Sequence, residues 1–267
     1  MALSVETYAT AAEAARALGG AGARYLGGGT LVMRDVNYGA TDFSRIVRST
    51  DPALGRIRPT GGRVEIGAGV TMAEVVESRE LAFLAPAARA VGGPAIRAMA
   101  SVGGNLFAPH PYGDFAAALL ALEASVTFAE GRTQPLADLL AARGRGPAPM
   151  VLSVSVLRPA GDAFRFRKVS RVKPKGVSVL SIAAHLPMAG GRVQGAAVAY
   201  GAMAATPRRA PAVERALEGC RLEAAAIGPA LAAATEGLDP PDDAVASGWY
   251  RRAVAPVHLR RLLLGED

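Results

Sequence analysis

The chain has 267 residues, of which 51% are hydrophobic and 20% are charged, and its formal net charge is +7. This balance is typical of a folded globular protein and excludes a disordered chain. No apolar run reaches the ~18 residues of a membrane span, and the first residues have neither the basic start nor the apolar core of a secretory signal.

The chain contains one cysteine, Cys220. One thiol can neither form an internal disulfide nor hold an iron–sulfur cluster, which needs about four protein ligands. We therefore expect a cytoplasmic protein that has no membrane span. The positive charge raises the question of nucleic-acid binding, but the basic residues are scattered and aromatic residues make up only 5%. We expect no nucleic-acid partner.

The first elements in the chain are predicted by their caps and turns. Residues 10–18 read as a helix that Thr10 caps, with Glu13 completing a capping box. Short strands follow at residues 23–26 and 45–50. Alternating apolar and polar residues on both sides of Gly61-Gly62 then predict a β-hairpin.

The middle of the chain begins with a helix at residues 71–78, for which Thr71 and Glu74 form a second capping box. A further helix is predicted to end at Gly92-Gly93, and Pro94 can start another. The stretch "SVGGNLFAPHPYGD" reads as a loop, followed by the helix "FAAALLALEA" with Asp114 as its N-cap, and by strands "SVTFA" and "MVLSVSVL".

The last third has a different character. Residues 176–206 form two β-rich segments about Gly190-Gly191, which predicts a hairpin, and helices are expected at 211–219, 223–237 and 248–266. Antiparallel strands covered by helices would form a separate lobe.

Two glycine clusters carry the strongest chemical signal, "GGGT" at residues 27–30 and "SVGGN" at residues 101–105. The first can be a tight turn only. Alternatively, each cluster offers consecutive backbone N–H groups with no Cβ in the way, so that a pyrophosphate could lie between them. The spacing does not match G-x-G-x-x-G, and no G-x-x-x-x-G-K-[ST] motif is present.

The segments "YLGGGTLVMR", "IRAMASVGGNLFAPHPYGDFAAALLALEA", "FRKVSR" and "WYRRAVAPVHLRRLL" resemble the FAD-binding medium subunit of the molybdenum hydroxylases, the carbon monoxide dehydrogenase and xanthine dehydrogenase family. The resemblance implies an α+β fold. A two-lobed FAD-binding domain of the PCMH (vanillyl-alcohol oxidase-like) type would span residues 1–160, with a lobe boundary near 55. A smaller C-terminal domain of antiparallel strands and helices would span residues 161–267.

The resemblance also implies which residues contact FAD. Val91 falls where relatives can place an aromatic side chain, Asp114 on an acidic contact, and Lys168 on a basic contact that could shift to Arg167. Val151 or Leu152 falls on an apolar ring contact. The stretch "KPKGVSV" departs from the usual start of that strand. The implied FAD-binding residues are Tyr25, Leu26, Gly27, Gly28, Gly29, Thr30, Leu31, Val32, Val91, Ser101, Val102, Gly103, Gly104, Asn105, Asp114, Val151, Leu152 and Lys168.

The function implied by the resemblance is electron transfer. A small subunit with [2Fe–2S] clusters would pass electrons to FAD on this chain, a large subunit would hold the molybdenum pterin cofactor, and the complex would be a dimer of heterotrimers. No catalytic or metal-binding residue is expected on this chain. The alternatives are an assembly subunit that has lost FAD, which the intact glycines disfavour, and a stand-alone flavin reductase of the same fold.

Several of these residues also have purely structural readings. Asp114 could serve only as a helix cap. His110 is read as a loop histidine without a ligand, and His185 and His258 as packing residues in a strand and a helix. Histidines and carboxylates show no metal-ligand spacing, and there is no Gly-x-Ser-x-Gly elbow.

Overall fold

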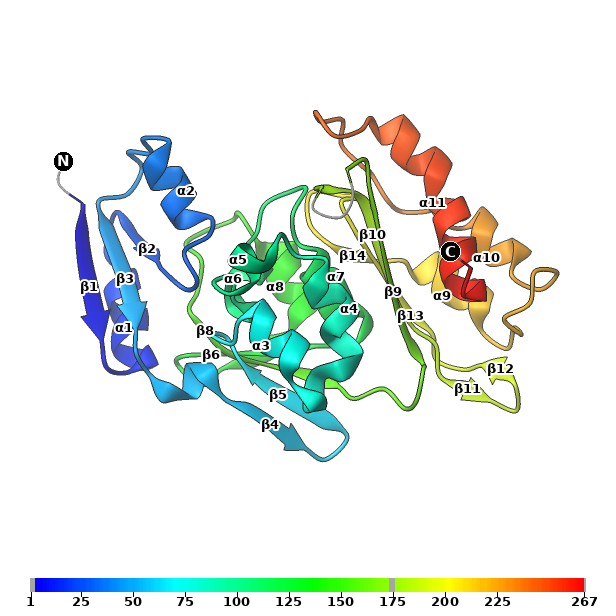
Figure 1. Cartoon of the computed structure of the whole chain (residues 1–267), viewed down its shortest axis with the longest axis horizontal. Coiled ribbons are helices and arrows are strands. Elements are labelled where there is room, and N and C mark those ends of the chain that lie inside the picture. Colours follow the sequence, from blue (N-terminus) through cyan, green and yellow to red (C-terminus); the bar gives the residue numbers. More distant parts are fainter. Residues whose placement is uncertain (1–2, 173–175, 267) are drawn as a thin grey trace.

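The computed structural model describes residues 3–172 and 176–266, so Lys173, Pro174 and Lys175 of the unusual "KPKGVSV" stretch lie outside the described residues. The described residues form three larger sheets, which follow one another along the long axis of the molecule in chain order, and one two-stranded sheet (Figure 1). Among the described residues, no helix is long and apolar enough to cross a membrane.

The first sheet is small and parallel. Its strands are β1 (Ser4–Tyr8), β3 (Arg45–Ser49) and β2 (Ala23–Tyr25), in the order β1-β3-β2. The helices α1 (Ala11–Leu18) and α2 (Val32–Asn37) connect these strands. Because all three strands run the same way, the turns that follow β2 and β3 emerge at the same edge of the sheet.

The second sheet has five antiparallel strands. The order is β4 (Ile57–Thr60), β5 (Arg63–Gly67), β8 (Val151–Leu157), β6 (Ser125–Phe128) and β7 (Thr133–Pro135). The helices before and within this lobe are η1 (Pro52–Gly55), α3 (Met72–Glu77), η2 (Arg79–Leu84), α4 (Ala85–Arg89), α5 (Pro94–Arg97), α6 (Val102–Leu106), α7 (Asp114–Ala121) and α8 (Leu136–Ala142).

The third sheet has the order β14 (Arg208–Arg209), β13 (Ala197–Gly201), β10 (Ser178–His185) and β9 (Phe164–Ser170), and a small hairpin of β11 (Met188–Ala189) and β12 (Arg192–Val193) extends from it. Helices α9 (Pro211–Leu217) and α11 (Gly248–Leu264) pack on one face of this sheet, α10 (Gly228–Ala232) packs against these two helices, and α7 packs on the other face (Figure 1). Every residue of β10 is therefore buried.

Elements with strong local signals were predicted correctly. Both capping boxes are present, with Thr10 and Glu13 at α1 and Thr71 and Glu74 at α3. The hairpin of β4 and β5 turns at Gly61-Gly62, and β11 and β12 turn at Gly190-Gly191.

Three local predictions were wrong. The segment "SVGGN" is not a loop: Ser101 caps the helix α6, and its hydroxyl accepts a hydrogen bond from the Gly104 N–H. Asp114 is the first residue of α7 rather than its cap, which is Gly113 at φ 109°. The helix expected over residues 223–237 is reduced to α10, where Pro229 lies in the first turn and cannot continue a helix that starts earlier.

Candidate functional site

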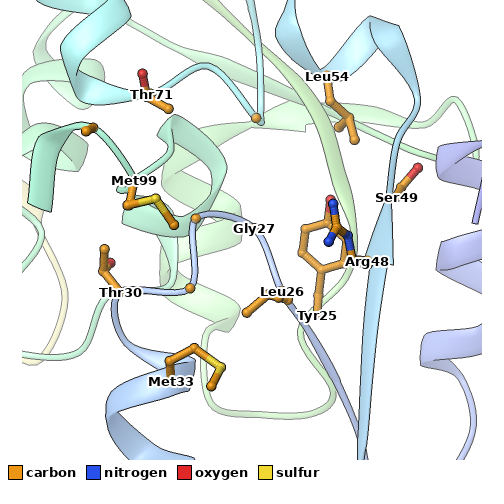
Figure 2. Close-up of a pocket in the computed structure, with 14 residues that line it drawn as sticks. Tyr25, Leu26, Gly27, Thr30, Met33, Arg48, Ser49, Leu54, Thr71 and Met99 are labelled. Carbon is orange, nitrogen blue, oxygen red and sulfur yellow. The ribbon is translucent and has the colours of Figure 1, made fainter. Parts of the chain in front are cut away.

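A cavity lies between the first sheet and the helical part of the second lobe. Its volume of about 550 Å³ is within the range of ligand pockets. Figure 2 shows the Tyr25 ring and the Arg48 side chain on one side of the glycine turn, with Met99 and Thr30 on the other. The lining residues are Tyr25, Leu26, Gly27, Gly28, Gly29, Thr30, Met33, Arg48, Ser49, Leu54, Gly69, Thr71, Ala98 and Met99.

The position of the cavity follows from the parallel sheet. The glycine turn begins at the carboxyl end of β2, and Arg48 and Ser49 form the carboxyl end of β3. Ligands of sheets with parallel strands bind at this edge because the turns there leave room and expose backbone groups. Six of the expected residues, Tyr25 to Thr30, line the cavity, whereas Leu31 and Val32 start α2 and do not.

The glycine turn is pressed against the second glycine segment. A Cβ on Gly28 would lie 2.5 Å from the carbonyl carbon of Met99 and overlap its oxygen, and a Cβ on Gly27 would lie 2.9 Å from the Ser101 hydroxyl. Gly29 adopts φ +75°, a conformation that side chains disfavour. The three glycines therefore make a turn and a close contact between two chain segments, and they also line the cavity.

The backbone donors of the two glycine clusters differ. In the part of the chain that the structure describes, the N–H groups of Gly27 to Thr30 form no hydrogen bond with the protein. The N–H groups of Val102 and Gly103 donate to the carbonyls of Val70 and Ala68, both at 2.8 Å. The expectation that both clusters offer free donors is thus correct for the first and wrong for the second.

The second cluster serves mainly to join α6 to the turn at residues 68–71. A Cβ on Gly103 would lie 2.7 Å from the Ala68 Cβ, so this glycine permits close packing. Gly104 is exposed, and only the Ser101 hydroxyl, at 3.0 Å, lies near a Cβ built there. Asn105 is buried, and its Oδ1 accepts a hydrogen bond from the Ala116 N–H at 3.2 Å in the first turn of α7.

Asp114 and Lys168 form a second group, which does not line the cavity. The Lys168 Nζ lies 3.0 Å from Asp114 Oδ2 and donates to the Ala90 carbonyl at 2.8 Å. The Ser178 hydroxyl donates to Asp114 Oδ1 at 2.6 Å. Of the two basic candidates on β9, Lys168 faces α7, whereas Arg167 donates a hydrogen bond to the Glu266 carbonyl just after α11.

The apolar candidates are placed less favourably for a ligand. Val102 and Val151 are buried in the core of the second lobe. Leu152 and Val91 are partly buried and pack against that core, and Val91 directly follows Ala90, the partner of Lys168. Of the pair Val151 and Leu152, only Leu152 keeps exposed surface.

Sequence reasoning missed eight lining residues: Met33, Arg48, Ser49, Leu54, Gly69, Thr71, Ala98 and Met99. The ends of parallel strands were available as a signal for Arg48 and Ser49. The others come from turns that approach the site only in the folded chain. Tyr25 points into the cavity, and burial raises the pKa of its phenol although the Arg48 charge opposes this.

His110 is engaged in a structural contact rather than in a metal site. Its Nε2 lies 2.6 Å from Asp243 Oδ2, and the buried Arg251 reaches the same oxygen at 2.8 Å. The described residues contain no group of three or more histidines, cysteines or acids that could hold a metal ion. Burial lowers the pKa of His185 in β10, as suits a packing residue.

The cavity fits a ligand that carries phosphate groups. It is lined by Arg48 and by four consecutive residues whose N–H groups have no partner in the described part of the protein, and none of its lining residues is acidic. Backbone N–H groups in such a turn are suited to bind anions.

Two family models match the chain. Residues 2–157 match the FAD binding domain in molybdopterin dehydrogenase, and residues 165–265 match the CO dehydrogenase flavoprotein C-terminal domain. The carbon monoxide dehydrogenase medium chain of Afipia carboxidovorans is 29% identical over 221 residues, which cover 77% of this chain and 75% of that one. The glyceraldehyde dehydrogenase medium chain of Sulfolobus acidocaldarius is 25% identical over 196 residues, covering 69% and 67% of the two chains.

Solved structures agree. Reconstituted CO dehydrogenase from Oligotropha carboxidovorans has a chain that matches with a TM-score of 0.89 and 26% identity, covering 98% of this chain and 96% of that one. Quinoline 2-oxidoreductase from Pseudomonas putida 86 matches with a TM-score of 0.85, 23% identity and coverage of 99% and 96%, which supports the fold alone. The expected α+β fold with a C-terminal domain is confirmed, and the chain belongs to the FAD-binding medium subunits of the molybdenum hydroxylase family of oxidoreductases.

Proposed function

We propose that the chain is the electron-transfer subunit of a molybdenum hydroxylase complex, which takes electrons from [2Fe–2S] clusters on a small partner subunit and delivers them to an external acceptor. A large partner subunit would hold the molybdenum pterin cofactor and oxidise the substrate. The single observation that carries the proposal is the cavity at the edge of the first sheet, lined by Gly27 to Thr30, whose N–H groups are unpaired among the described residues.

The residues of this chain have binding and positioning roles in the proposal. The four N–H groups would hold phosphate oxygens of the cofactor, and Leu26 and Met99, which line the same cavity, would cover the bound group against water. When bound, FAD supplies the redox chemistry. The proposal requires no side chain of the cavity to act as a general acid or base.

The remaining expected contacts form the second part of the proposal. Asp114, Lys168, Val91 and Leu152 would lie toward the ring end of the cofactor, as the family resemblance implies, and the ion pair fixes the first two in place. The same resemblance supports a division into domains at residues 1–160 and 161–267, and assembly as a dimer of heterotrimers.

The first test concerns cofactor identity. The purified full-length chain is expected to show a flavin absorption spectrum and to release FAD rather than FMN on denaturation. In a titration, FAD should bind at least about tenfold more tightly than FMN, because FMN lacks the second phosphate and the adenosine. Equal affinity for both would remove the argument from the phosphate-binding turn, and a colourless chain that still assembles with partners would favour the assembly-subunit alternative.

The second test concerns electron flow. The chain alone should not be reduced by purines, aldehydes or carbon monoxide, whereas a complex that contains iron and molybdenum should be reduced by its own substrate. Substrate-driven flavin reduction by the isolated chain, with no iron or molybdenum present, would contradict the proposal and favour a stand-alone flavin reductase.

A further inference from the structure

Arg48 occupies the carboxyl end of the central strand of the first sheet. The last pair between β2 and β3 joins Tyr25 to Val47, and the Leu26 N–H donates to the Val47 carbonyl at 2.8 Å. Arg48 is the next residue of β3 and therefore lies beside the start of the glycine turn. It lines the cavity there together with Tyr25 (Figure 2).

The Arg48 side chain has no polar partner in the part of the protein that the structure describes. Within the described residues its guanidinium forms no ion pair and no hydrogen bond. Two other arginines of this lobe are paired: Arg45 lies 2.8 Å from Glu6, and Arg24 lies 2.9 Å from Asp35.

Asp51, the first acidic residue after Arg48 in the sequence, bonds backbone N–H groups rather than Arg48. Asp51 accepts hydrogen bonds from the N–H groups of Ala11 and Ala53, each at 2.9 Å. These bonds hold the pKa of Asp51 below its ordinary value. Arg48 is the sole charged side chain among the lining residues, so its charge remains available to a ligand.

We infer that Arg48 is a specificity-determining residue that binds a phosphate group of the cofactor from the side opposite the unpaired N–H groups of Gly27 to Thr30. The inference rests on the proposed function, in which this cavity holds FAD. A guanidinium presents a planar set of donors that suits phosphate oxygens, and in a cavity without acidic side chains it favours phosphorylated ligands over neutral ones. An exposed arginine that is merely solvated would give no such preference.

The test compares four forms of the full-length chain after removal of flavin: wild type, Arg48→Met, Arg48→Lys and the control Arg16→Met. Arg16 is an exposed arginine of α1 in the same lobe, and it does not line the cavity. Each form is titrated with FAD, and ADP and adenosine are then used as competitors. Thermal melting checks that each variant is folded.

We expect Arg48→Met to weaken FAD and ADP by about tenfold to a hundredfold, which is the usual worth of a hydrogen bond to a charged group. Adenosine should bind as in the wild type, Arg48→Lys should retain part of the preference for ADP, and Arg16→Met should match the wild type. The loss should shrink at high salt because the interaction is between charges.

The inference is overturned if folded Arg48→Met binds FAD and ADP as tightly as the wild type, or if it loses ADP and adenosine to the same extent. The second result would mean that Arg48 shapes the cavity rather than binding phosphate. In both cases the wild-type chain still binds FAD, so the proposed function stands. A wild-type chain that binds no FAD would instead contradict the proposed function itself.

Discussion

Gly28 packs directly on the Met99 carbonyl group, and this contact joins the two glycine segments across the edge of the first sheet. A Cβ on Gly28 would lie 2.5 Å from the Met99 carbonyl carbon and 3.2 Å from the Ala100 Cα. Both neighbours are backbone atoms, so neither can move aside as a side chain would. The close approach of the first lobe to the segment between α5 and α6 therefore requires a residue without a Cβ at position 28.

Gly28→Ala is therefore expected to destabilise the protein and to separate the two segments. Overlap with backbone typically costs about 1–3 kcal/mol and sometimes more, and we expect the upper end because no flexible group is involved. Denaturant unfolding of the variant measures the change. Gly62→Ala is the matched control, because nothing lies within 4 Å of a Cβ built at Gly62 in the hairpin turn. An equally stable Gly28→Ala protein would show that the two segments are free to move apart.

Substitution of Gly103 should lower stability, whereas substitution of Gly104 should affect flavin binding. Gly103→Ala places a methyl group 2.7 Å from the Ala68 Cβ and should cost about 1–3 kcal/mol of stability. Gly104→Val adds its side chain on the exposed face of α6, so the fold should be kept, and because the family resemblance implies that this segment contacts FAD, bound flavin should be lost. Unfolding midpoints and flavin content measured on both variants separate the two effects. Full flavin content in Gly104→Val would mean that this face of α6 does not approach the cofactor.

The parts of this molecule that were predictable are those whose cause is local in sequence. Thr10 with Glu13 and Thr71 with Glu74 specify helix starts within four residues, and glycine pairs specify hairpins. The helix α6 was missed because its first N–H groups bond Val70 and Ala68, more than thirty positions earlier in the chain. A glycine-rich segment favours a loop until such partners are known.

The candidate site was predictable to the extent that a motif marks it. The resemblance identified Tyr25 to Thr30, which line the cavity, and it identified Asp114 and Lys168 separately. It did not reveal that the last two bind each other, since the pairing depends on how α7 packs on β9 and β10. Arg48 has no motif around it, and its position at the cavity follows only from the parallel arrangement of β2 and β3.

The Lys168–Asp114 pair should be sensitive to the loss of either partner. Both side chains are largely buried, at 14% and 8% exposure, so Lys168→Met leaves a carboxylate without its counter-charge. Breaking a buried pair costs about 3–5 kcal/mol, and we expect an unfolding midpoint lowered accordingly. The double variant Lys168→Met with Asp114→Asn should recover part of the loss, because the buried charge is then absent as well.

The exposed pair of Arg252 and Asp239 provides the comparison for that experiment. Its side chains are 45% and 98% exposed, so Arg252→Met should change stability by less than about 1 kcal/mol. Equal effects of Lys168→Met and Arg252→Met would contradict the buried pairing. The same would follow if the double variant were as unstable as the sum of its single substitutions predicts.

Asp243 should make the protein sensitive to acid. Burial by itself would raise the pKa of this carboxyl, but hydrogen bonds from the Ala246 N–H, His110, Arg251 and the Val245 N–H outweigh it and hold the pKa well below its ordinary value. A lowered folded-state pKa stabilises the protein above the unfolded-state pKa of about 3.9, and this contribution is lost as the pH falls below that value.

Asp243→Asn should thus be less stable than the wild type at pH 7, and it should lose less stability than the wild type between pH 7 and pH 3. Unfolding curves at both pH values, with Asp239→Asn as the exposed control, measure the difference. If wild type and Asp243→Asn lost the same free energy of unfolding between pH 7 and pH 3, the contacts of His110 and Arg251 with this carboxylate would not control acid unfolding.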